Sequence, residues 1–515
     1  METRNGKDAK PEYERLLNDA PPESTPPLVE NGAGVHSTET YTLEEAINSL
    51  GMGLFQFLLM VYVGFAWMSD AMEMMLLSFL GPAVRCEWDL TDNEKSAISS
   101  VVFVGMLFGA YIWGAVSDAL GRKVGFTATA TMTALAGFGS ALSPNYAALL
   151  IFRSLVGFGL GGIPVAFGIF MEFVPSKRRG RLSILMQCAW VIGAMTEAAL
   201  AWAILPTLGW RALLMFSTAP LVLLLVLFPF LPESPRFLVN KGRIEEAEVI
   251  LARIARINRK TLPPGRLVGP KLIQDNTEVR KSISTRLASI LSGMISELKR
   301  TYCKKYLRTS VILHTSWFTN AFAYYGLVLL ATELHSQEKG ECNGRVAVPI
   351  SGKDYEDILI TTSAEGVGNL VGILIIDLIG RIKSMALSMG VCSFALIPLL
   401  AFRLSAHGAT AFLFIARGSS LLSFSVLYAY TAEYYPTSMR SFSLGLSNVW
   451  SRLGGLVAPF VAVSMVDGGH KSAAEVMLIA LCGITAIATM FLQTETTGQA
   501  LAEDEEDKEE EKISA

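Results

Sequence analysis

Three charged side chains lie inside stretches of sequence that are otherwise apolar. Asp70 and Glu73 are three residues apart in the first long apolar stretch, and Arg153 lies in the fourth. Residues with this spacing share one face of a helix, and a carboxylate beside a cation takes up and releases a proton when that cation moves. We therefore expect Asp70, Glu73 and Arg153 to form a proton-coupling site in which Asp70 pairs with Arg153. An inert ion pair that holds helices together is the alternative.

Further polar and aromatic side chains are spread over several apolar stretches, as expected of residues that line one central water-filled cavity. Aromatic rings can stack on a flat or cationic ligand, although any one of them can equally fill a core. The two acids of this group can equally be capped or solvated groups near the ends of their stretches. The candidate substrate-binding residues are Trp67, Trp190, Glu197, Asn320, Tyr324, Tyr325, Glu365, Asn448, Trp450 and Arg452.

Two motifs of the first half recur in the second half at nearly the same distance. Asp377 follows Asp118 by 259 residues, and Arg440 follows Arg179 by 261. A near-constant offset predicts two similar halves. In each motif a carboxylate and a cation stand at the end of an apolar stretch, where they can hold two helices together in one state and release them in another. The candidate gating residues are Asp118, Gly121, Arg122, Glu172, Arg179, Asp377, Arg381, Glu433 and Arg440, with Glu172 expected to act with Arg179 and Glu433 with Arg440.

The apolar stretches themselves predict the architecture. With 51% apolar and 17% charged residues and a mean hydropathy of +0.42, the chain is too apolar for an ordinary soluble protein. A helix needs roughly 20 apolar residues to cross a bilayer, and twelve stretches meet that requirement, six on either side of a charged interval. We expect an all-α membrane protein with twelve transmembrane helices in two pseudo-symmetric six-helix bundles.

Lysine and arginine gather in alternate loops and in the central interval, which predicts that these segments and both termini are cytoplasmic. An amphipathic helix is expected from Arg243 to Asn258. The expected division is a disordered tail (1–45), a first bundle (46–231), a cytoplasmic linker (232–306), a second bundle (307–495) and an acidic tail (496–515). An acidic dileucine pattern ending at Leu16 and Leu17 favours a vacuolar or endosomal membrane, with the plasma membrane as the other expectation.

Several classes of function are disfavoured. The sequence contains no phosphate-binding loop and no zinc-protease or serine-hydrolase motif, so we expect neither an enzyme nor a cofactor. The six cysteines have no metal-ligand spacing, and a net charge of −3 argues against nucleic acid. Cys86 and Cys342 fall in loops expected to face outward. A disulfide between them and two free thiols are the two alternatives there. The expected partners are a small organic ion, protons and the lipid bilayer, and the chain is expected to be monomeric.

Four motifs together resemble the major facilitator superfamily on its sugar and organic-ion branch. They begin at Gly114, Arg153, Glu172 and Pro232 and read GAVSDALGRK, RSLVGFGLGG, EFVPSKRRG and PESPR. Shorter segments, including SDAMEMM from Ser69 and NAFAYYG from 320, are similar to synaptic vesicle 2-related proteins and to plant organic cation/carnitine transporters, a group related to niacin permeases.

This resemblance implies a secondary active transporter that works by alternating access, with the Asp70 and Arg153 positions matching a proton-linked pair. It also implies a small aromatic carboxylate such as nicotinate as the substrate. An organic cation or carnitine, or a ligand-binding vesicle protein without transport, remains the alternative. Ile382 stands where the family usually has another basic residue, which implies a weaker latch in the second half.

Overall fold

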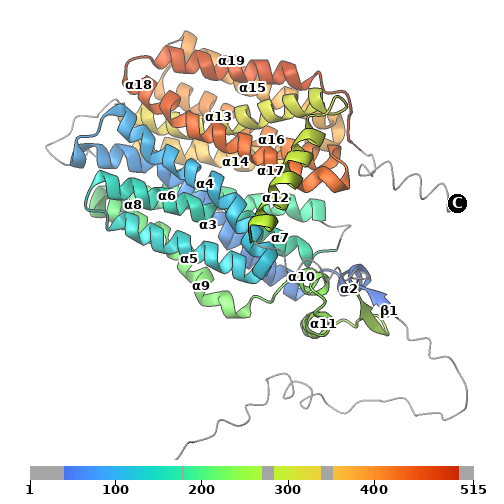
Figure 1. The fold of residues 1–515 in the computed structure, drawn as a ribbon. Coiled ribbons are helices and arrows are strands. Elements are labelled where there is room, and N and C mark those ends of the chain that lie inside the picture. Colours follow the sequence, from blue (N-terminus) through green and yellow to red (C-terminus); the bar gives the residue numbers. More distant parts are fainter. Residues whose placement is uncertain (1–39, 176–178, 270–282, 338–351, 403, 498–515) are drawn as a thin grey trace, which may run out of the picture.

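A computed structural model describes residues 40–175, 179–269, 283–337, 352–402 and 404–497. The chain folds into two layers of helices, one from each half of the sequence, as Figure 1 shows. The first-half layer contains α3 (Leu54–Trp88), α4 (Asp92–Leu120), α5 (Arg122–Ala141), α6 (Tyr146–Leu160), α7 (Pro164–Glu172), α8 (Arg179–Ser217) and α9 (Ala219–Leu227). The second-half layer contains α13 (Leu307–Gln337), α14 (Gly352–Ile379), α15 (Arg381–Ala401), α16 (Ala406–Tyr434), α17 (Thr437–Pro459), α18 (Met465–Asp467) and α19 (Lys471–Thr489).

Nine helical segments of the described chain are long and apolar enough to cross a membrane. One of them runs for 46 residues, from Leu185 to Phe230, and contains a non-helical residue at Gly209 with φ 77°. It therefore supplies two crossings. Two further helices, α5 and α13, have spanning lengths of 20 and 31 residues but carry more polar side chains, four threonines in α5 and His314 and Asn320 in α13. Together these segments make the twelve crossings of the predicted all-α fold, which is confirmed.

A small helical unit lies at the end of the first layer, on the side of the central linker. It contains β1 (Thr40–Thr42), α2 (Leu43–Leu50), α10 (Pro235–Asn240), α11 (Ile244–Asn258) and β2 (Arg266–Val268). The two strands pair in parallel, with Thr40 opposite Arg266. Asn258 at the end of α11 accepts a 3.0 Å hydrogen bond from the backbone N–H of Phe55, so α11 is tied to the start of α3. The predicted amphipathic helix is therefore present and is buried against this unit through Ala247 and Leu251.

The structure differs from the expected tail at residues 40–45, which form β1 and the first turn of α2 rather than disordered chain. The hydroxyl of Thr42 caps the backbone of Glu45, and the Glu45 carboxylate accepts from the backbone of Thr42, a reciprocal capping box. The strand partner of this segment lies more than 200 residues away in the sequence. Residues 1–39, including the dileucine pattern, and residues 498–515 of the acidic tail lie outside the described residues.

Glycines allow close contact between helices inside the first layer. A Cβ placed on Gly157 of α6 would lie 2.0 Å from the carbonyl oxygen of Val102 on α4, and one on Gly109 would lie 1.9 Å from the carbonyl oxygen of Phe158. Backbones can approach this closely only where neither residue has a side chain in the way. The glycine run after Arg153 thus has a packing role, and α4 is held directly against α6.

Gly157→Ala should destabilise the protein by about 1–3 kcal/mol, because the added methyl group forces α4 and α6 apart. The thermal midpoint of the purified protein in detergent, followed by size-exclusion chromatography, measures this effect. Gly445→Ala on α17 is the matched control, because no atom lies within 4 Å of the added Cβ, and it should leave the midpoint unchanged or raise it. Equal midpoints for both variants would contradict the close packing.

Candidate functional site

Each layer buries one arginine and pairs it with one glutamate. In the first layer, Arg153 on α6 donates to the Glu73 carboxylate on α3 across 2.9 Å, and both side chains are at most 1% exposed. In the second layer, Arg417 on α16 pairs with Glu365 on α14 across 2.7 Å, and both are at most 2% exposed. A buried charge is tolerated only with a partner of this kind. Among the described residues, these two pairs are the most deeply buried ion pairs.

Asp70 takes a different partner from the one expected. Arg153 binds Glu73 rather than Asp70, because the two acids on α3 point in directions roughly 60° apart around the helix. Asp70 is only 5% exposed, and the charged groups that act on it are Arg452 of α17 and Glu73. Asp70 therefore faces a cation of the opposite half of the molecule. The expected Asp70–Arg153 pair is therefore wrong, because Arg153 pairs with Glu73; Arg452 is the cation whose charge acts on Asp70.

Aromatic side chains connect the two halves through hydrogen bonds. The indole N–H of Trp190 on α8 donates to the Tyr324 hydroxyl on α13 across 2.9 Å, and that hydroxyl donates to the Glu365 carboxylate across 3.0 Å. Trp67 lies edge-on to Trp190, with ring centroids 6.3 Å apart. This chain of contacts runs from α3 and α8 in one layer to the buried Arg417–Glu365 pair in the other.

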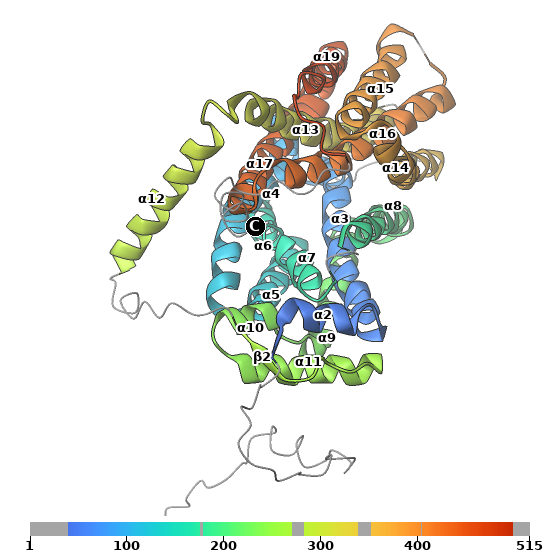
Figure 2. The ribbon, with the colours of Figure 1, turned by 90° about the vertical axis from the view of Figure 1, so that its right-hand side faces the viewer.

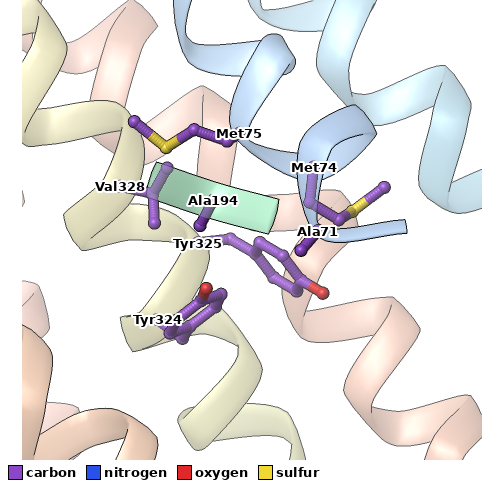
Figure 3. Close-up of a pocket in the computed structure, with 7 residues that line it drawn as sticks. All are labelled: Ala71, Met74, Met75, Ala194, Tyr324, Tyr325 and Val328. Atoms are coloured by element: carbon purple, nitrogen blue, oxygen red, sulfur yellow. The ribbon is translucent and has the colours of Figure 1, made fainter. Parts of the chain in front are cut away.

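A small cavity lies at this junction. Figure 3 shows its lining, in which Tyr324 and Tyr325 of α13 face residues of α3 and α8. Its volume is about 10 Å³, room for about one water molecule and far less than the roughly 300–1,000 Å³ of an ordinary small-molecule pocket. The lining is mainly apolar, with two phenol groups as its polar part. The lining residues are Ala71, Met74, Met75, Ala194, Tyr324, Tyr325 and Val328.

Several buried polar atoms of the two layers lack hydrogen-bond partners among the described residues. They include one carboxylate oxygen each of Asp70, Glu73 and Glu365, and one guanidinium nitrogen each of Arg153 and Arg417. Buried polar atoms are nearly always satisfied by protein or by water. Water or another polar partner is therefore expected beside these buried groups.

Other predicted substrate-binding residues have partners within their own helices or layers. Glu197 is fully buried and accepts from the Ser217 hydroxyl at 2.8 Å. The Asn320 amide donates to the Ser316 carbonyl, and Asn448 accepts from the Tyr428 hydroxyl. Trp450 stacks on His314 with ring centroids 6.1 Å apart. The structure thus places Tyr324 and Tyr325 in the cavity wall, with Trp190 and Glu365 hydrogen-bonded to Tyr324, and these other side chains in separate contacts.

On the side away from the linker, the two layers are joined by polar contacts. Lys95 of α4 and Asp467 of α18 form a 3.0 Å ion pair in which both side chains are under 5% exposed. The Ser96 hydroxyl donates to the carbonyl of Pro459, and the Ser100 hydroxyl donates to that of Leu456. Helices α4 and α17 run antiparallel along this contact. The two layers are therefore in direct contact at the end away from the linker, called here the outer end.

The gate motifs form the same arrangement twice. Arg122, at the start of α5, pairs with Asp118 and with Glu172 at the end of α7. Arg381, at the start of α15, pairs with Glu433 near the end of α16. Glu172 and Glu433 thus bind the arginine of the preceding motif. Glu433 therefore pairs with Arg381 rather than with Arg440 as expected, whereas the expected pairing of Glu172 with Arg179 stays a prediction. The side chains of Arg179 and Asp377 lie outside the described residues.

Residues 71–507 match the family described as "Sugar (and other) transporter". The organic cation/carnitine transporter 7 of Arabidopsis thaliana is 39% identical over 484 residues, covering 90% of this chain and 96% of that protein. The synaptic vesicle 2-related protein of Xenopus laevis is 39% identical over 477 residues, covering 90% and 83%. The chain is a member of the major facilitator superfamily.

The fold of this facilitator protein agrees with solved members of the superfamily. The inward-open structure of the xylose transporter XylE from E. coli superimposes with a TM-score of 0.64 over 87% of this chain and 98% of that one, at 16% sequence identity. The protein therefore belongs to a family of multi-pass membrane transporters rather than of enzymes, as the sequence predicted.

Two functional-site residues of the facilitator protein were missed by sequence reasoning. Glu233 accepts from the backbone N–H of Lys123 at 3.1 Å, and Glu495 accepts from the backbone N–H groups of Arg381 and Ile382 at 2.9 and 3.1 Å. Each carboxylate thus caps the helix that follows Gly121 or Gly380, both of which have positive φ. Their separation of 262 residues matches the internal repeat, and that offset was the signal that could have found them.

The outer-loop cysteines are only partly described. Cys86 is disulfide-bonded, whereas Cys342 lies outside the described residues. The thiols of Cys188, Cys303, Cys392 and Cys482 are free.

Arg153→Met should lower the stability of the facilitator protein by about 3–5 kcal/mol, because it leaves Glu73 buried without its cation. Adding Glu73→Leu should restore most of that loss, whereas adding Asp70→Leu should not. Thermal midpoints of the three variants in one detergent measure the coupling. Equal rescue by both second substitutions would show that Arg153 does not select Glu73.

Glu495 should make stability depend on acid pH. Burial would raise the pKa of Glu495, but hydrogen bonds from Thr497 and from the backbone of Arg381 and Ile382 outweigh it and hold the pKa below its ordinary value of 4.5. The stabilising contribution is therefore complete above the ordinary value and is lost as pH falls through the lowered one. Glu495→Gln should lower the thermal midpoint near neutral pH, and the difference from wild type should shrink in acid. A pH-independent difference would contradict this assignment.

Proposed function

We propose that the protein is a proton-coupled secondary transporter of small organic ions that works by alternating access, with nicotinate or a related pyridine carboxylate as its substrate. The observation that carries the proposal is the set of buried polar atoms without hydrogen-bond partners in both layers, together with the small cavity between the layers. A flat ring can stack on an aromatic side chain such as Tyr324 or Tyr325 once the halves move apart. A carboxylate is matched by the free guanidinium nitrogen of Arg417.

The proposed proton carrier is Asp70, with Arg153 and Glu73 supporting it. Arg452, which acts on Asp70, belongs to the opposite layer. A motion that separates α3 from α17 takes this cation away, and an acid that loses its cation takes up a proton more readily. Protonation and separation of the layers would then favour each other, which is the linkage that coupled transport requires.

The gate on the linker side is proposed to close by continuing the contact between α4 and α17. The antiparallel pairs already formed are Ser96 with Pro459 and Ser100 with Leu456. Extending that register to the other end of both helices brings Asp118 opposite Arg440. Two nitrogens of the Arg440 guanidinium are buried without a hydrogen-bond partner among the described residues, and Asp118 is 68% exposed. Each group is available to the other when the linker side closes.

An organic cation or carnitine is the second candidate substrate. The relative named organic cation/carnitine transporter 7 supports it, as does the excess of acids among Asp70, Glu73, Glu197 and Arg153 in the first layer. A vesicle protein that binds ligand without moving it is the third, suggested by the relative named synaptic vesicle 2-related protein. That name also favours a vesicular or vacuolar membrane over the plasma membrane. We further propose a monomer with both termini in the cytoplasm.

Purified protein in proteoliposomes should take up labelled nicotinate when an inward proton gradient is imposed. Asp70→Asn should abolish the gradient-driven part of the uptake, because it removes the proposed proton carrier. Glu246→Gln, at an acid on the exposed face of α11, is the control and should transport like wild type. An uptake rate that is the same with and without the proton gradient would refute coupling. Uptake of carnitine but not of nicotinate would favour the second candidate substrate. Binding without uptake or counterflow would favour the vesicle protein.

A further inference from the structure

One amphipathic helix lies outside both layers. Helix α12 (Ile283–Thr301) leads into α13, and Figure 2 shows it beside the bundles rather than among them. It contacts α17, and the Tyr111 hydroxyl of α4 donates to the sulfur of Met294 across 2.8 Å. Sequence reasoning identified only the helix now seen as α11, which is buried. The role of α12 is therefore unassigned.

The last turns of α12 have an apolar side and a basic border. Met294, Ile295 and Leu298 fall within about 100° of the helix surface. Ile295 is 53% and Leu298 40% exposed, so protein covers only part of this side. Lys299 lies about 40° beyond Ile295 and is exposed, and the exposed Lys304 follows in the next segment. Exposed apolar side chains beside lysines are typical of helices that lie in a membrane interface.

The position of α12 places this side at a lipid surface. α12 is followed within a few residues by α13, so its C-terminal end lies where α13 enters the bilayer. Met294 contacts Tyr111 of α4, on the face of α4 that turns toward α17. Phe108 and Ile112, on the adjoining side of α4, are exposed apolar side chains of a membrane span. The apolar side of α12 continues that surface. Lipid is therefore the occupant that both the position and the chemistry favour.

We propose that α12 is a membrane-docking helix that binds anionic lipid headgroups of the leaflet on the linker side. Ile295 and Leu298 enter the acyl boundary, and Lys299 and Lys304 contact the headgroup charges. Positive residues on this side agree with its predicted cytoplasmic orientation, and cytoplasmic leaflets carry anionic lipids. The docked helix would hold the linker against the membrane beside α4 and α17. This inference does not depend on the transported substrate.

Hydrogen exchange of the full-length protein in nanodiscs tests the proposal without any substitution. Peptides that cover residues 292–301 should exchange more slowly in discs of phosphatidylcholine with phosphatidylserine than in discs of phosphatidylcholine alone, by about fivefold for each lysine that engages an anionic headgroup. Peptides from α13 should exchange equally in both discs and serve as the internal reference. Equal exchange rates of residues 292–301 in the two kinds of disc would overturn the proposal. Anionic lipid would then not be what covers the apolar side of α12.

Matched charge reversals separate the lipid contact from a general effect of charge. Lys299→Glu with Lys304→Glu should abolish the difference between the two discs. Arg256→Glu with Lys260→Glu, which changes the same charge at exposed positions in and after α11, should retain it. Ile295→Ser with Leu298→Ser should speed exchange in both discs, because the apolar contact is lost. Retention of the phosphatidylserine effect in the α12 reversal, or its loss in the α11 reversal, would contradict the proposal.

Discussion

The structure depends on pairing its two deeply buried arginines with buried glutamates. Arg153 and Arg417 are among the largest fully buried side chains of the protein, and each would be strongly destabilising without its glutamate. The two arginines are 264 residues apart, close to the offset of the repeat, yet they bind different elements. Arg153 binds the first crossing of its half through Glu73, whereas Arg417 binds the second crossing of its half through Glu365. The halves therefore share a fold but not an electrostatic layout.

This difference gives the two halves distinct chemistry at their junction. The first half contributes three acids and one arginine to the centre, Asp70, Glu73, Glu197 and Arg153, so one cation cannot neutralise all of them. The second half contributes two arginines, Arg417 and Arg452, and one buried acid, Glu365. The excess acids of the first half are therefore attracted to the excess arginine of the second half, as the effect of Arg452 on Asp70 illustrates. An attraction of this kind strengthens when the halves approach and weakens when they separate, so the charge state of the centre and the arrangement of the halves are physically linked.

The sequence was sufficient to predict the crossings, the two halves and most charged positions, because these follow from local hydropathy and from the internal repeat. It was not sufficient to pair the charges. The i, i+3 spacing places Asp70 and Glu73 on the same side of α3, but it does not say which of them contacts Arg153. That depends on how α3 is rotated about its axis relative to α6. Glu172 and Arg179 are near in sequence, yet Arg122, 50 residues away, is a partner of Glu172. Segment 40–45 was misassigned for the same reason, since its strand partner is remote.

The two ends of the molecule differ in whether their polar contacts join the two halves or lie within one half. At the outer end, α4 and α17 are joined by side chains that reach backbone carbonyls, such as Ser96 to Pro459, and by the buried Lys95–Asp467 pair. At the linker end, the gate cations Arg122 and Arg381 are bound within their own halves. A carboxylate cap at the start of α5 and of α15 reinforces each of these clusters. The linker-side clusters therefore join helices within each half, while the outer contacts hold the halves together. Opening the outer end must break the Lys95–Asp467 pair, and it leaves the contacts of both gate clusters in place.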